Sequence, residues 1–89
     1  MNVISMFHGI IVSMVYSPEG ELKVPHLYVL FQDTQSIFTI PDGILLSGDI
    51  PLGKRKLLEA WIELHKDELI ANWQLAVIGN KLYQVEPLK

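Results

Sequence analysis

The chain changes its hydrophobic pattern near residue 50, and this change limits its fold more than any other feature. Before that point, short runs rich in β-branched and aromatic residues are separated by turn residues, a pattern typical of β-strands. From Leu52 to Ile78 the composition and the spacing of apolar residues are those of a helix. The pattern predicts an α+β fold in which a C-terminal helix or broken helix pair packs on one face of a sheet.

The N-terminal half predicts an antiparallel meander of three to five strands. The segments "SPEG" at 17–20 and "PDG" at 41–43 are strong turn signals. The first run is apolar on both faces, as in a central strand, and Gly9 within it predicts a bulge or a close backbone approach. The expected strands cover residues 6–16, 25–32, 36–40 and 44–47, with one further edge strand at 81–85.

The helical half carries start and stop signals but does not keep one phase. Asp49 is expected at or near the cap of the helix, with Pro51 in its first turn, and "GN" at 79–80 is a fitting end. At 100° per residue, the apolar face of the second half is rotated by about one residue from that of the first. The expected buried residues are Leu57, Leu58, Trp61, Ile62 and Leu64, followed by Leu69, Ile70, Trp73, Ala76 and Val77.

Two interpretations of this phase shift remain open. The favoured one is a break between His65 and Asp67, with Asp67 as the N-cap of a second helix. The alternative is one unbroken helix, which would leave Ile70, Trp73 and Val77 on an exposed stripe for a partner.

Composition and charge exclude several classes of function. With 89 residues, the chain is expected to form a single domain, residues 1–89. Its net charge of −3 and the absence of a basic run longer than "KRK" argue against nucleic acid as the main partner. Without cysteine it has no disulfide or thiolate site, and a cytoplasmic location is expected. The sequence has no uninterrupted run of 18 apolar residues, so no membrane span is predicted. Neither a cofactor nor a metal is expected.

One candidate site lies at the start of the second strand run, in "VPHLYVLF". His26 and Tyr28 are two residues apart, so both point to the same face of a strand. An imidazole can shuttle protons or bind a metal, and the phenol could assist it. The simpler interpretation, which we favour, is a strand face whose amphipathic residues reach water with their polar tips.

A second candidate site lies in the helical half, where polar residues interrupt the apolar face of Trp61. In a straight helix, His65, Glu68 and Asn72 would share that face, and a His–Glu pair in a cleft could act in acid/base chemistry or bind a metal. The simpler and favoured interpretation is that they tie the helix break to the sheet through hydrogen bonds. As binding residues we expect His26, Tyr28, Trp61, His65, Asn72 and Trp73.

Four segments together resemble one small bacterial family, the uncharacterised domain of unknown function 4160. They are "VISMFHGIIVSM", "PHLYV", "FTIPDGILLSGDIP" and "WIELHKDELIANW". The resemblance extends over nearly the whole chain, and the pattern W-x-x-L-H-x-x-E-L-x-x-N-W from Trp61 to Trp73 is its most specific part.

The chain departs from the family pattern at three positions. Tyr28 stands where the family has a second histidine, Thr39 where it has an aspartate, and Met6 where it has a basic residue. If the family had a His/His/Asp site, this member would lack two of the three ligands. The family has no established activity, but its genes commonly lie beside a gene for another small domain, in pairs described as toxin–antitoxin-like. The resemblance therefore implies a small partner protein.

Two functions follow as expectations. The first is a non-enzymatic protein-interaction module that binds a small partner protein or itself through an exposed apolar strip. The strip is expected around Ile11 and Val15, or around Ile70 and Val77. The alternative is a small hydrolase or metal-dependent enzyme that uses as catalytic residues His26, Tyr28, His65 and Glu68.

Overall fold

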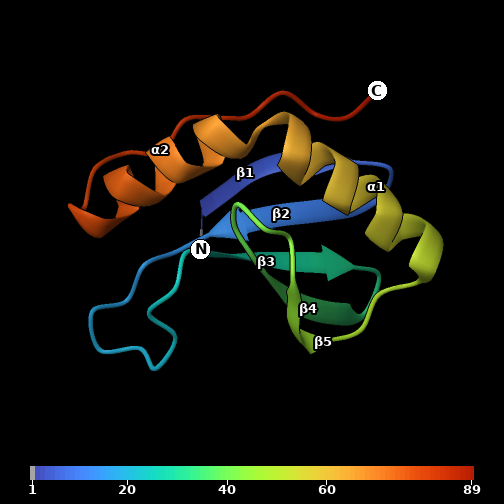
Figure 1. Ribbon diagram of the computed structural model, residues 1–89, viewed down its shortest axis with the longest axis horizontal. Coiled ribbons are helices and arrows are strands. Elements are labelled where there is room, and N and C mark those ends of the chain that lie inside the picture. Colours follow the sequence, from blue (N-terminus) through green and yellow to red (C-terminus); the bar gives the residue numbers. More distant parts are fainter. Residues whose placement is uncertain (1) are drawn as a thin grey trace.

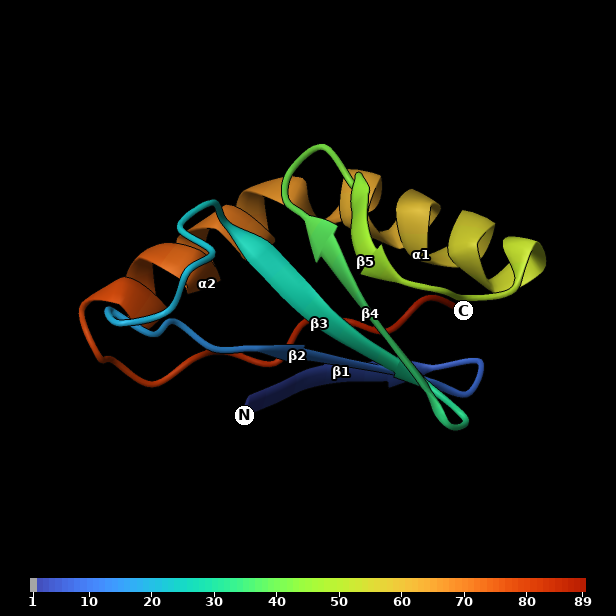
Figure 2. The same ribbon diagram turned by 90° about the horizontal axis from the view of Figure 1, so that it is seen from below.

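The structure, a computed structural model, describes residues 2–89 and is an antiparallel five-stranded sheet followed by two helices (Figure 1). The elements are β1 (Asn2–Phe7), β2 (Ile10–Met14), β3 (His26–Phe31), β4 (Thr34–Thr39), β5 (Leu45–Gly48), α1 (Leu52–Leu64) and α2 (Lys66–Val77). Neighbours in sequence are neighbours in the sheet, in the order β1-β2-β3-β4-β5. The predicted α+β meander is confirmed, and both helices lie on one side of the twisted sheet (Figure 2).

The single strand expected at 6–16 is wrong, because the chain turns back in its middle. His8 and Gly9 both have positive φ, 51° and 79°, and they link β1 and β2 in a two-residue hairpin. Such hairpins need left-handed backbone at their centre, which glycine adopts without steric cost. Gly9 therefore makes a turn and not a bulge, and the irregularity in this pair lies between Val3 and Ser5.

The hydrophobic core lies between the sheet and the helices. Alternate residues of the strands, among them Val12, Leu27 and Phe38, are fully buried against the helices. At the edge strand, Gly48 has φ of +83°, and a side chain there would overlap the Gln35 carbonyl of β4. Glycine is thus required for β5 to pair with β4 at this point.

The helices break where the phase shift predicted, although the expected N-cap Asp67 is wrong and Asp49 lies near the cap of α1 without being the cap residue. His65, with φ −113° and ψ 20°, separates α1 from α2. Because α2 begins at Lys66, Asp67 lies within its first turn and is not the N-cap. At α1 the N-cap residue is Pro51, without a side-chain bond, while Asp49 accepts a hydrogen bond from the Ile50 amide instead.

Of the ten helix residues expected to be buried, five are buried, Leu57, Ile70 and Ala76 are half-buried, and Leu64 and Val77 are exposed. On α1, Leu58, Trp61 and Ile62 are buried. Leu64 is 68% exposed because it lies at the last position of α1, next to the break. On α2, Leu69 and Trp73 are buried while Val77 is 43% exposed, so the second apolar face is narrower than expected.

The last nine residues, 81–89, form an extended segment that we call the C-terminal strap. The chain leaves α2 through Gly79 in the left-handed region, and the amides of Gly79 and Asn80 bond back to the carbonyls of Ala76 and Leu75, as in a Schellman motif. The strap then runs back along the helices (Figure 1). It is not the strand expected at 81–85, although the Val85 amide does donate to the Ile4 carbonyl of β1.

Candidate functional site

We call the face of the sheet turned away from the helices the open face. No helix or strand of residues 2–89 lies over it (Figure 2). Strand register places two rows of side chains on it, since residues paired across strands share a face. One row crosses all five strands: Val3, Ser13, Tyr28, Ile37 and Ser47. The second row crosses four: Met6, Ile11, Leu30 and Gln35.

The two rows of the open face are mostly apolar and carry no formal charge. As bounded here, the five strands contain no Asp, Glu, Lys or Arg. Met6 is 62% exposed, and Val3 and Leu30 are each 41% exposed. An uncharged surface with several exposed large apolar residues is uncommon on a soluble chain and is typical of an interaction surface.

Two shallow hollows lie on the open face, on either side of Tyr28. One, of about 360 Å³, is lined by side chains from β1 to β4, including Ile11, Tyr28 and Leu30. The other, of about 260 Å³, lies where the loop between β2 and β3 meets the sheet, and His26 and Glu21 line it. Tyr28 therefore belongs to both hollows, in the third of five strands.

The structure places His26 beside Tyr28, as the strand spacing predicted, and fixes its imidazole. The ring centroids are 5.3 Å apart, and the ring of Trp73 on α2 is 5.1 Å from His26 on another side. His26 Nδ1 lies 2.7 Å from the Val24 carbonyl, which can only accept, so Nδ1 carries the hydrogen. With only 4% of its surface exposed, His26 mainly connects the β3 end to α2.

His65 and Glu68 meet each other in a different environment. His65 Nδ1 is 2.8 Å from Glu68 Oε1, and the imidazole packs 5.6 Å from the ring of Trp61. The Glu68 side chain is 58% exposed, so the pair lies at the surface of the helix break. The expected pair of His65 and Glu68 does form. His65 contacts Trp61 and Glu68, whereas His26 contacts Trp73 and Tyr28.

Asn72, predicted as a polar interruption of the helix, holds the strap. Its side-chain amide donates to the Tyr83 carbonyl at 2.8 Å and accepts from the Tyr83 amide at 3.0 Å. The side chain thus pairs with the strap backbone as a neighbouring strand would, while Asn72 is only 2% exposed. These bonds satisfy both polar groups of the buried Asn72 side chain, which explains why an amide stands on an apolar helix face.

The two tryptophans are also buried and packed within the fold. Trp61 is fully buried, packs 5.1 Å from the Phe7 ring, and donates its Nε1 hydrogen to the Glu86 carbonyl of the strap at 2.8 Å. Trp73 is 7% exposed and meets the Tyr16 ring edge-on at 5.6 Å. Of the six expected binding residues, only Tyr28 presents a substantial surface on the open face.

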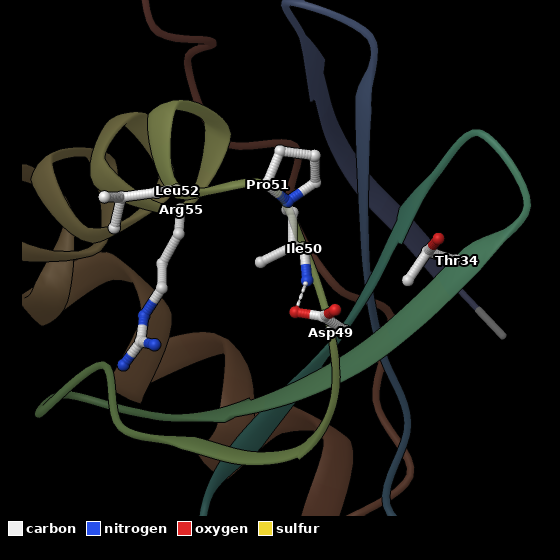
Figure 3. A pocket seen from close by; sticks show the side chains of 6 residues that line it. All are labelled: Thr34, Asp49, Ile50, Pro51, Leu52 and Arg55. Atoms are coloured by element: carbon white, nitrogen blue, oxygen red, sulfur yellow. Dashed lines mark hydrogen bonds between the residues drawn. The ribbon is translucent and has the colours of Figure 1, made fainter.

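A third hollow lies near the start of α1, where Asp49, Arg55 and Thr34 surround the entry of the helix (Figure 3). The polar groups here have partners within the chain: Asp49 accepts from the Ile50 amide and Arg55 Nε lies 3.3 Å from Glu59. Neighbouring Lys54 donates to the His8 carbonyl and lies 5.3 Å above the Phe31 ring. Lys54 is therefore a link between helix and sheet, and not part of a freely solvated basic patch.

Within residues 2–89, no group of three or more His, Asp or Glu side chains is arranged to hold a metal ion. Over the same range, no helix has the length and apolar character needed to cross a membrane.

Comparison with known proteins gives a family. The family model described as Domain of unknown function (DUF4160) matches residues 9–74 of the 89. The chain belongs to this family. No curated protein and no solved structure matches the chain. The matched range covers β2 to β5, α1 and most of α2, and it ends before the strap.

The geometry assigns parts to the most specific segment of the family resemblance, Trp61 to Trp73. Trp61 and Asn72 both bond the strap backbone, and Trp73 packs on the ring of His26. These residues seal the helix layer against the sheet, so their spacing follows from packing. The side-chain hydrogen bonds of the predicted polar residues differ from the simpler interpretation: His65 bonds to Glu68, and Asn72 bonds to the strap and not to the sheet.

Sequence reasoning missed most of the open face. It named Ile11 and Val15 as apolar strip residues and Tyr28 as a binding residue, but not Met6 or Leu30. The signal was present in strand alternation, but it could be used only after Gly9 was recognised as a turn, since that turn sets the register between β1 and β2.

Proposed function

We propose that this protein is a protein-interaction module whose docking surface is the open face of the sheet. The observation that carries the proposal is the pair of uncharged, largely apolar side-chain rows across the strands. The helices cover the other face and leave this one to solvent, whereas soluble chains rarely keep large contiguous apolar patches in water. A partner would remove this surface from water, at a gain of about 25 cal/mol per Å² before the costs of association.

Two kinds of partner fit such a face. One is a second copy of the chain, and the other is a small protein encoded beside it, as in the toxin–antitoxin-like pairs that the family resemblance implies. We place this function in the bacterial cytoplasm, because the chain carries no cysteine and a reducing compartment imposes no cost on it.

The enzyme interpretation receives no comparable support. An enzyme of this kind would need His26 and the His65–Glu68 pair to act on one reacting group. All three side chains would then have to lie within hydrogen-bond reach of that group. His26 instead donates its Nδ1 hydrogen to the Val24 carbonyl, and the Glu68 carboxylate is paired with His65 at an exposed helix break.

The test uses co-purification from the native host at endogenous level, with the wild-type chain and two variants. Leu30→Glu places a charge at the middle of the open face, while Glu59→Gln changes a charge on exposed helix surface of α1. We expect associated chains to be lost with Leu30→Glu and retained with Glu59→Gln. Association that survives Leu30→Glu, or no association with any form, would contradict the proposal.

A further inference from the structure

The open face has the properties expected of a surface that meets its own copy. The chain has a net charge of −3, so two copies repel each other at long range. In a two-fold symmetric pair the same patch meets itself, and any charge near the axis then faces an identical charge. Two copies can meet through the two rows without such pairs, because the rows carry no Asp, Glu, Lys or Arg, and Glu21 lies outside them, in the hollow at the loop between β2 and β3.

The shape of the face is also compatible with itself. Met6 is 62% exposed and Leu30 41%, so both can project into a partner. The hollow of about 360 Å³ beside them is lined by apolar side chains such as Ile11 and Tyr28. A two-fold axis lets projecting residues of each copy enter the hollow of the other, and the unbranched side chain of methionine adapts readily to such a space.

The size of the face is near what a stable pair needs. Five strands about 4.8 Å apart and six residues long at about 3.3 Å each cover roughly 500 Å² in plan. Projecting side chains and flanking loops enlarge the accessible area, so each copy would bury on the order of 600–800 Å². That lies within the range of specific interfaces, about 1,200–2,000 Å² for both partners together.

We propose that two copies of this chain associate through their open faces, sheet against sheet, around a two-fold axis near Tyr28 and Leu30 of β3. This inference rests on the proposed function and names its partner as a second copy. β3 is the middle strand of five, so an axis through it lets each row meet a row of the other copy. Face-to-face sheets keep their strands within about 30° of each other, which accommodates the twist of the two sheets.

The experiment uses charge pairing at Leu30, measured by sedimentation equilibrium of the purified full chain at tens of micromolar. The wild type is expected at twice the mass of one chain. Leu30→Glu and Leu30→Lys are each expected at the mass of one chain, because each would place like charges across the axis. Mixing the two variants in equal amounts is expected to restore the double mass, since opposite charges then meet. Circular dichroism of each variant checks that the fold is retained, as expected for a half-exposed position.

A monomeric wild type at these concentrations would overturn the inference, as would dimers that persist in both variants alone. Failure of the mixture to associate would overturn the placement of the axis near Leu30. These outcomes are separate from those of the proposed function. If the pure chain is monomeric while a different host protein is lost specifically with Leu30→Glu, the second copy is wrong and the docking surface stands.

Discussion

The two faces of the sheet differ in what they leave exposed, although they are built from the same five strands. On β3, Leu27 points to the helices and is completely buried, whereas Leu30 points to the open face and is 41% exposed. On the helix side Asn72 has hydrogen-bond partners, although the buried Ser5 hydroxyl has none within residues 2–89, while the open face has exposed apolar groups without cover. The difference separates residues that hold the fold from residues available to a partner.

The largest effect is expected from truncating Trp61, a large side chain of α1 that is fully buried in the core between the helices and the sheet. Trp61→Ala should lower the free energy of unfolding by about 3–5 kcal/mol, because it leaves a cavity and an unpaired carbonyl at Glu86. Urea unfolding followed by circular dichroism measures this. Trp61→Phe is the control: it keeps an aromatic ring but no N–H donor, and should cost less. An unchanged midpoint for the alanine variant would mean that Trp61 does not form the core.

The matched pair on β3 tests the comparison directly. Leu27→Ala should cost about 2–5 kcal/mol, the range for buried leucine truncation. Leu30→Ala should change the stability of the monomer by less than about 1 kcal/mol, because its side chain already meets water. Both are measured by urea unfolding at low protein concentration, so that association does not contribute. Equal costs for the two leucines would show that the open face is not open.

The hydrogen bonds between Asn72 and the strap give a third prediction. Asn72→Ala should cost about 2–4 kcal/mol, because the Tyr83 amide and carbonyl lose their partners in a buried place. Hydrogen exchange at Val85, whose amide bonds to Ile4, should accelerate as the strap loosens. Gln84→Ala is the control, since Gln84 bonds to Val3 from an exposed position. A cost no greater than that of Gln84→Ala would separate Asn72 from the strap.

The fold could be predicted from the sequence because its signals are local. Strand runs, the "PDG" turn, the helical spacing around Trp61 and the phase shift at His65 each depend on a few adjacent residues. The β1–β2 hairpin was missed because the residues on both sides of "HG" form one apolar run, so Gly9 was interpreted as a bulge, although histidine is one of the non-glycine residues that adopt positive φ more often than most. The caps were misplaced because element ends vary by one or two residues and Pro51 took the N-cap position.

The candidate site was less predictable, since it depends on contacts distant in sequence. That His26 lies near Tyr28 follows from strand geometry, but its contact with Trp73 requires α2 to be placed over the sheet end. Likewise the polarity of Asn72 looked like part of a site, because residues 81–85 were expected as an edge strand and not as a strap that brings Tyr83 beside α2. In a sequence, a buried structural amide and a catalytic amide look the same, and they can be distinguished only once the hydrogen-bond partner is known.

The smallest effect is expected on the charged surface of α1, which completes the comparison with a region that is exposed but not apolar. Arg55 and Glu59 form a 3.3 Å ion pair one helical turn apart, with side chains 36% and 42% exposed. Solvent screens such pairs, so Glu59→Gln should change the free energy of unfolding by no more than about 0.5 kcal/mol. It should also leave the sedimentation of the chain unchanged, because the pair lies on the helix layer and away from the open face. Equilibrium sedimentation beside Leu30→Glu makes the contrast: both variants alter one charge at an exposed position, and only the one on the open face should abolish association. Loss of association with Glu59→Gln would mean that the interface includes the helix layer, because this change reduces the net charge from −3 to −2 and so weakens the repulsion between copies.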